Sequence, residues 1–192
     1  MKKLIFISVL AILLSSCTTI GFENPVPNNT KSLTEFPQEL IGTYYDGEKD
    51  TLRIYKTSYV YGRPDSTVLF MNDTLKKGLI ELKKFNDYYI LNKKSDKAEI
   101  WGILPFTFRN GKIEVYFANL DTKKESLKVE GDTSKIKIET VINMLDKITP
   151  VTSIIKEGSS ENDYIINPTN EELNKILEER YFIKVIEFSR IK

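Results

Sequence analysis

The sequence predicts a mainly β protein with minor α content, built as an antiparallel meander that forms a partly or fully closed barrel. Three observations predict this fold. Short segments with alternating apolar residues recur every eight to twelve residues or so, as expected of a sandwich or barrel. Turn signals of the Asp-Gly and Asn-Gly type separate several of them. Helical periodicity is confined to the C-terminal part, where one or two short helices are expected.

The chain begins with a segment typical of a secretory signal. Two lysines precede the apolar block Leu4–Leu14, which is shorter than the roughly 20 residues needed to span a bilayer. The following Leu14-Ser15-Ser16-Cys17 resembles the lipobox of bacterial lipoproteins, and Cys17 is the only cysteine of the chain. The resemblance implies that residues 1–16 are cleaved and that Cys17 carries a diacylglyceryl lipid. A transmembrane helix or an unlipidated signal peptide is the alternative.

The same resemblance bears on location. Thr18, rather than an aspartate, follows Cys17, which in the lipoprotein sorting rule implies delivery to the outer membrane, facing the periplasm. Residues 17–35 contain Pro25 and Pro27 and show no helical or strand period, so we expect a lipidated flexible tether. Residues 36–192 then form a single β-rich domain.

Nine strands are expected in the first half of this domain. Asp46-Gly47, Asn86-Asp87 and Asn110-Gly111 mark hairpin turns between neighbouring segments. The predicted strands are Leu40–Tyr45, Thr51–Tyr55, Ser58–Tyr61, Thr67–Met71, Leu79–Lys83, Tyr88–Asn92, Ala98–Leu104, Phe106–Phe108 and Lys112–Ala118.

Beyond Leu120 the pattern is mixed. Thr169 and Glu172 match a capping box, and Leu173, Ile176 and Leu177 make the apolar stripe of the helix that follows. Around this helix we expect a short strand over Lys135–Ile138, a helix or strand over Glu139–Ile148, an extended Val151–Ile155, a strand over Tyr164–Ile166 and a closing strand over Phe182–Ile191.

Composition restricts the chemistry. The chain has 28 basic and 27 acidic residues, and because they are interleaved we expect no nucleic-acid partner. It has no histidine, which excludes Ser-His-Asp catalysis and the common zinc sites. Carboxylate chemistry, Ser-Lys chemistry and calcium binding remain. The carboxylates of Asp46–Asp50 are interpreted as a solvated hairpin tip rather than a calcium loop. We therefore expect no metal, no cofactor and no catalytic residue.

A family resemblance supports the barrel. Cys17, a spacer, Phe36-Pro37 and Leu40-x-Gly42-x-Tyr44 resemble the start of small lipoproteins of Bacteroidota. Gly42-Thr43-Tyr44 is similar to the Gly-x-Trp opening of lipocalin-like barrels, with tyrosine in place of tryptophan. Arg190 resembles the closing arginine of that family, which implies that it packs over the Tyr44 ring.

These observations favour a non-enzymatic, lipid-anchored protein of the cell envelope that binds a partner protein or a small apolar ligand. The barrel interior would then form the pocket, lined by Tyr44, Leu52, Ile54, Tyr61, Ile90, Trp101, Ile113 and Val115. A structural or inhibitory interaction protein with a filled core is the alternative, and a carboxylate-dependent enzyme is the third possibility.

Overall fold

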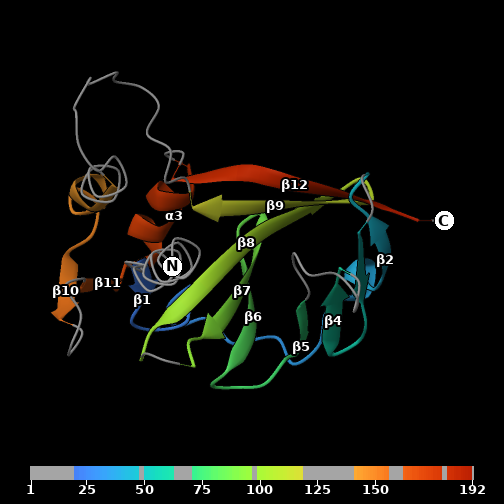
Figure 1. The fold of residues 1–192 in the computed structure, drawn as a ribbon, viewed down its shortest axis with the longest axis horizontal. Coiled ribbons are helices and arrows are strands. Elements are labelled where there is room, and N and C mark those ends of the chain that lie inside the picture. Colours follow the sequence, from blue (N-terminus) through green and yellow to red (C-terminus); the bar gives the residue numbers. More distant parts are fainter. Residues whose placement is uncertain are drawn as a thin grey trace, which may run out of the picture.

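The fold is mainly β, and in the described part of the chain twelve strands form one large sheet (Figure 1). This computed structural model describes residues 20–47, 50–62, 71–96, 99–118, 141–155, 162–178 and 181–191. Besides the strands, it contains a 3-10 helix η1 (Gln38–Leu40), a helical turn over residues 141–145 and the helix α3 (Asn170–Glu178). The prediction of a β-dominated chain with one or two short helices near the C-terminus is therefore confirmed.

The strand bounds agree with most of the predicted segments. The strands are β1 (Ile20–Phe22), β2 (Gly42–Tyr45), β3 (Thr51–Ile54), β4 (Ser58–Tyr61), β5 (Met71–Thr74), β6 (Ile80–Phe85), β7 (Tyr88–Lys94), β8 (Trp101–Arg109), β9 (Lys112–Ala118), β10 (Val151–Ile155), β11 (Asn162–Ile166) and β12 (Phe182–Arg190). The predicted strand Lys135–Ile138 and most of Thr67–Met71 lie outside the described residues.

One strand replaces two predicted ones. The segments Ala98–Leu104 and Phe106–Phe108 were expected to be separate, but β8 runs through Pro105 without a break. Proline lacks the N–H that a central strand uses in its ladder. Along one edge, β8 pairs with β1 at Trp101 and with β9 from Phe106 onward, so Pro105 falls between these two pairings.

The sheet runs in chain order and is joined by its last strand. Neighbouring strands pair from β2 to β5 and from β6 to β9, and β12 pairs with both β9 and β2. In the described part of the chain, no pairing links β5 to β6. A fully closed barrel is therefore not what the structure shows. Instead of β5, Leu33 bridges to Leu82 on the free edge of β6, with a 2.8 Å hydrogen bond from the Leu33 N–H to the Leu82 carbonyl.

The N-terminal segment belongs to the folded body. β1 pairs in parallel with β11 and antiparallel with β8, so the sheet is not purely antiparallel. Phe22 and Val26 are buried, and Gly21 packs so closely on Ile100 that an added Cβ would lie 2.9 Å from its side chain. The prediction of a flexible tether is thus wrong for residues 20–35, which belong to the folded body rather than preceding it.

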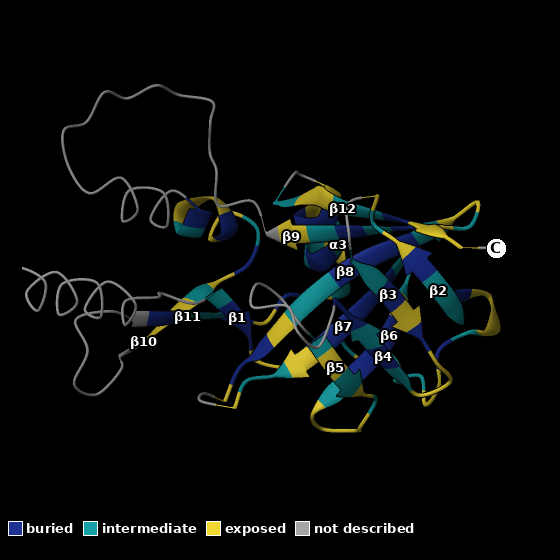
Figure 2. Ribbon diagram, turned by 45° about the vertical axis from the view of Figure 1, so that its right-hand side comes forward, coloured by how far each residue is buried: buried dark blue, intermediate teal, exposed yellow. Residues whose placement is uncertain are grey.

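Two apolar cores lie on opposite faces of the sheet, which is buried along its middle and exposed at its turns (Figure 2). The first core is formed by inward residues of β2 to β9 and β12, among them Tyr44, Leu82 and Phe106. The second core lies on the other face of β7 and β8 and includes Phe22, Ile90 and Trp101. Residues from β5 and β6, the two strands that do not pair with each other, contribute to the first core or pack against it, so the sheet curves around that core.

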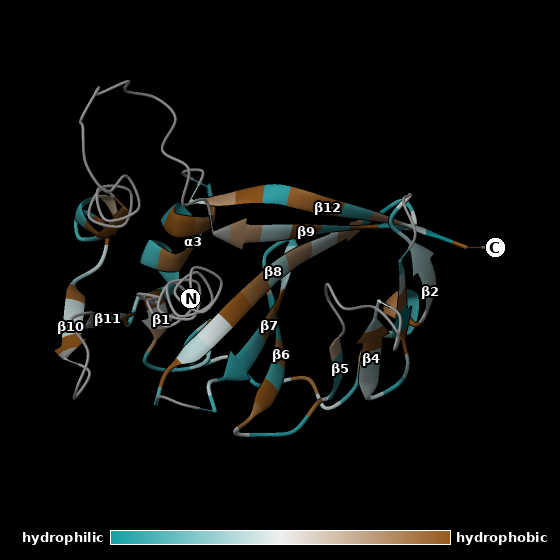
Figure 3. Ribbon diagram, in the orientation of Figure 1, coloured by the Kyte–Doolittle hydropathy of each residue, from teal (hydrophilic) through white to brown (hydrophobic). Residues whose placement is uncertain are grey.

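The second core is covered by α3, which is apolar on one side and polar on the other (Figure 3). Its predicted capping box is confirmed, because the Glu172 N–H donates to Thr169 Oγ1 at 3.2 Å and the Thr169 N–H donates to Glu172 Oε2 at 2.8 Å. Leu173, Ile176 and Leu177 face the core. The helical turn over residues 141–145 adds Val141 and Leu145, so helix rather than strand forms in the Glu139–Ile148 segment.

Candidate functional site

A small apolar cavity lies in the first core, between β3, β4 and β5 on one side and β8, β9 and β12 on the other. Its volume is about 60 Å³. Fourteen side chains line it, and all of them are aliphatic, aromatic or methionine. The lining includes Phe117, which is 40% exposed, and the half-buried Met71 and Ile186, so the cavity reaches the surface at one side.

The structure brings five of the eight predicted pocket residues together. Leu52, Ile54, Tyr61, Ile113 and Val115 line the cavity. Tyr44 is fully buried in the same core but does not line the cavity.

Ile90 and Trp101 are placed differently, because both belong to the second core. Side chains alternate between the two faces of a strand, and Ile90 lies between Tyr89 and Leu91, which face the first core. Trp101 likewise lies on the face of β8 opposite to Leu104 and Phe106. The assignment of these two residues to an interior pocket is therefore wrong.

Sequence reasoning missed the other nine lining residues. Some could have been found from the two-residue period. Phe117 follows Ile113 and Val115 on the same face of β9, and Leu91, the neighbour of Ile90 in β7, faces the cavity in its stead. Phe36 carries no such signal, because it lies outside every strand. The full set of missed residues is Phe36, Tyr59, Met71, Leu91, Leu104, Phe106, Phe117, Ile186 and Phe188.

Arg190 covers one end of the first core. It packs over the Tyr44 ring, as its resemblance to the closing arginine of lipocalin-like barrels implied. The guanidinium carbon lies 5.2 Å from the centre of the Tyr44 ring and 5.6 Å from that of Phe108. The guanidinium also donates to Tyr44 Oη at 2.6 Å and to the Glu39 carbonyl. Tyr44 in turn donates to the Leu40 carbonyl at 2.8 Å. These contacts tie the last strand to η1 and β2, where cation–π and charge-assisted bonds both contribute.

A second set of polar contacts lies where the sheet is not closed. Asp73 of β5 accepts a 2.9 Å hydrogen bond from Tyr59 and forms a 2.9 Å ion pair with Lys93 of β7. Burial and the nearby Asp73 carboxylate raise the pKa of the Tyr59 hydroxyl, so it remains a donor. The contact holds β5 near β7 with side chains instead of a backbone ladder.

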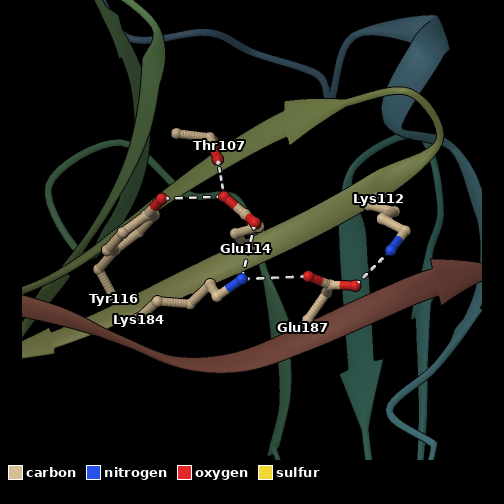
Figure 4. Close-up of polar contacts among 6 residues, drawn as sticks. All are labelled: Thr107, Lys112, Glu114, Tyr116, Lys184 and Glu187. Carbon is tan, nitrogen blue, oxygen red and sulfur yellow. Dashed lines mark hydrogen bonds and ion pairs between the residues drawn. The ribbon is translucent and has the colours of Figure 1, made fainter.

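The outer face of β9 and β12 carries a charged network (Figure 4). Lys184 donates to Glu114 at 3.0 Å and to Glu187 at 3.1 Å, and Lys112 contacts Glu187 at 2.6 Å. Tyr116 donates to the other oxygen of Glu114 at 3.0 Å.

The network keeps its carboxylates ionised. The Lys184 hydrogen bond lowers the pKa of Glu114, and the Lys112 and Lys184 bonds lower that of Glu187. A general acid needs a carboxyl pKa raised toward neutrality, so these shifts are opposite to those of a catalytic pair. Their arrangement is that of a surface network that stabilises the β9–β12 pairing.

The described ranges hold no group of three or more histidine, cysteine, aspartate or glutamate side chains placed to bind a metal ion. Nor does any helix in them combine the length and apolar character needed to cross a bilayer. Cys17, the predicted lipidation site, lies outside the described residues.

Comparison of this chain with protein-family models, with curated proteins and with solved structures finds no match.

Proposed function

We propose that this chain is a lipid-anchored, non-enzymatic protein of the cell envelope whose β body binds a small apolar ligand in the cavity of the first core. The anchor is Cys17, and the location is the outer membrane, facing the periplasm. We also infer that the strands from β2 to β9, with β12, form an incompletely closed barrel of the lipocalin-like type. The strand order and the packing of Arg190 over Tyr44 support this inference.

The observation that carries the proposal is an unfilled, wholly apolar space inside a packed core. Protein interiors are close-packed, and an empty cavity costs about 24 cal/mol per Å³. For 60 Å³ this amounts to about 1.4 kcal/mol, which an apolar group entering the cavity would recover.

The cavity size limits the ligand. Pockets for whole small molecules measure about 300–1,000 Å³, whereas this cavity is only about twice the roughly 30 Å³ that a water molecule occupies in the liquid. It suits the end of an aliphatic chain or another small apolar group, with the rest of the ligand outside.

The second candidate is an interaction protein with an essentially filled core, and the small cavity volume also favours it. An exposed apolar patch offers a contact surface for a partner protein. Phe117 and Ile183 are paired neighbours on β9 and β12, and both they and Val185 are more than one-third exposed.

Ligand titration of a cavity-filling variant separates the two candidates. Val115→Ile adds one methylene to the cavity wall, and Val185→Ile makes the same change at an exposed position of β12. Binding of a series of n-alkanols would be followed through the methyl NMR signals of Ile113 and the other core residues. We expect saturable shifts in the parent and in Val185→Ile, with affinity at least fivefold weaker in Val115→Ile.

Two results would count against the proposal. Shifts that never saturate for any chain length would leave the filled-core interaction protein as the better candidate. Equal affinity in Val115→Ile and the parent would place the ligand outside this cavity. The anchor is tested separately, because Cys17→Ser should move the protein from the membrane fraction to the soluble fraction; a variant that still sediments with membranes would contradict the lipid attachment.

A further inference from the structure

A polar cleft lies on the outer side of β6, on the face opposite to the apolar cavity. It is open, about 430 Å³ in volume, and is bounded by the chain that follows β1, by β6 and by the residues before α3. Its walls are Asn24, Pro25, Asn28, Asn29, Lys83 and Asn167. Four of these six residues carry side-chain amides, which can both donate and accept hydrogen bonds.

Lys83 is the only charged residue of this lining, and it is 6% exposed. Its ammonium donates to the carbonyls of Pro25 at 2.8 Å and Pro27 at 3.1 Å. An ammonium has three N–H donors, so one remains for a further acceptor. Burial lowers the pKa of Lys83, in keeping with a charge that has lost much of its hydration.

Within the described residues no carboxylate pairs with this buried ammonium directly, although the nearby negative charge of Glu81 acts to raise the pKa of Lys83. Glu81 lies two positions earlier on the same face of β6, but no ion pair joins it to Lys83 within the described residues. The Glu81 carboxylate instead accepts hydrogen bonds from the Ser32 hydroxyl and, at 2.8 Å, from the Gly78 N–H. A buried charge is costly unless it is paired or fully hydrogen-bonded. The Lys83 ammonium therefore has room for an anionic acceptor.

Two amides at the rim, those of Asn24 and Asn29, are available for the same acceptor. Asn24 and Asn29 are exposed, and neither side chain makes a hydrogen bond to another described residue. The Asn28 amide is held in place by the Pro168 carbonyl, at 2.8 Å. Asn29 adopts a left-handed backbone conformation, with φ of 59°, in the turn that forms the rim of the cleft.

We propose that this cleft binds a small oxyanion, a phosphate or carboxylate group, through the third N–H of Lys83 and the rim amides. Charge-assisted hydrogen bonds of this kind are among the stronger ones in proteins. The oxyanion can belong to a free small molecule or to a lipid headgroup. Asn24 of the cleft follows Cys17 by seven residues, a reach of about 25 Å at most. If Cys17 carries its proposed lipid, the cleft therefore lies within reach of the membrane surface.

Phosphate titration of three variants tests the site. The chain would lack residues 1–16 and carry Cys17→Ser, which leaves every described residue in place, and the side-chain amide signals of the asparagines would be followed by ¹⁵N NMR. Lys83→Met removes the ammonium, and Asn29→Gly removes one rim amide while tolerating the left-handed backbone. Lys84→Met is the matched control, because it removes the same charge from the adjacent position of β6. The Lys84 ammonium lies 3.9 Å from the centre of the Tyr89 ring, and Lys84 does not line the cleft.

We expect saturable shifts with inorganic phosphate in the parent, binding at least tenfold weaker in Lys83→Met and two- to fivefold weaker in Asn29→Gly, and unchanged binding in Lys84→Met. Equal binding in Lys83→Met and Lys84→Met would overturn the proposal, and so would shifts that do not saturate. If circular dichroism shows that Lys83→Met is unfolded, Asn29→Gly decides alone, and parent-like binding in that variant overturns the site.

Vesicles identify the source of the oxyanion. Sedimentation with phosphatidylglycerol vesicles, absent with phosphatidylcholine vesicles and lost in Lys83→Met, would assign the cleft to an anionic headgroup. Phosphate binding without vesicle binding would assign it to a free ligand. Both results support the oxyanion site, and neither depends on the apolar cavity, because the two sites lie on opposite faces of the sheet.

Discussion

Replacing Asn92 with leucine should detach the segment that follows β1 from the outer face of the sheet. Asn92 is completely buried in β7, and its side chain holds both backbone polar groups of Val26. Asn92 Oδ1 accepts from the Val26 N–H at 2.8 Å, and Asn92 Nδ2 donates to the Val26 carbonyl at 2.8 Å. Leucine has a similar size and shape but offers neither bond.

The cost follows from the groups left behind. Val26 is 1% exposed, so in Asn92→Leu its N–H and carbonyl would be buried without partners. Each such group costs about 1–3 kcal/mol, so the free energy of unfolding should fall by about 2–6 kcal/mol. Since small proteins have a total stability of about 5–15 kcal/mol, this loss is large enough to release the segment or unfold the chain.

Guanidinium unfolding followed by circular dichroism and by tryptophan emission measures the effect. Trp101, the only tryptophan, pairs with Phe22 of β1 and is buried in the second core. Release of β1 should therefore shift its emission to longer wavelength before the sheet unfolds. Asn72→Leu, at an exposed position of β5, is the control and should change stability by less than about 0.5 kcal/mol. If Asn92→Leu is as stable as this control, the clamp on Val26 does not hold the segment.

Two further predictions concern the ends and the outer face of the sheet. Arg190→Met removes the ring contact and the hydrogen bond to Tyr44, and thermal unfolding should show a loss of about 1–3 kcal/mol. For the charged network, the lowered pKa of Glu114 contributes stability above its ordinary value of 4.5 that is lost as the pH falls below it. The hydrogen bonds that Lys184 makes to Glu114 and Glu187 raise the pKa of Lys184 above its ordinary value of 10.5. The lysine therefore contributes stability below pH 10.5 that is lost as the pH rises above that value. The unfolding temperature, measured against pH, should therefore fall less steeply on the acid side in Glu114→Gln and less steeply on the alkaline side in Lys184→Gln.

Matched substitutions serve as controls for these two predictions. Arg109→Met removes an arginine from an exposed ion pair with Asp87 and should cost less than about 1 kcal/mol. A loss as large as that of Arg190→Met would show that the Tyr44 contact has no special weight. Lys175→Gln removes an exposed lysine of α3 that lies outside the network. Equal pH profiles for Lys175→Gln, Lys184→Gln and the parent would contradict the assignment of the alkaline loss to Lys184.

Local patterns predicted the hairpins well because each is specified by neighbouring residues. Asn110 and Gly111 have φ angles of 53° and 76°, as an Asn-Gly hairpin turn between β8 and β9 requires. The capping box at Thr169 is likewise complete within four residues. In both cases the physical cause lies within the segment that carries the pattern.

The N-terminal segment was mispredicted because its stability comes from distant residues. Pro25 and Pro27 argue locally against a strand, and residues 23–30 indeed form none. The segment is nevertheless fixed by Asn92 and Lys83, which lie more than fifty residues away in the chain. A pair of side-chain clamps of this kind leaves no period in the sequence.

The β-rich class, most strands, the hairpin turns and the cap of α3 could be predicted from the sequence, since these depend on contacts between residues close in the chain. Which face of each strand meets which core depends instead on long-range packing. Because side chains alternate along a strand, the sequence predicts that Ile90 and Leu91 face opposite sides of β7. Both sides of β7 are covered by apolar residues, however, so the alternation does not indicate which side faces the cavity. The packing of α3 and β1 on the outer face makes the second core, and that packing also places Lys83 in its polar cleft.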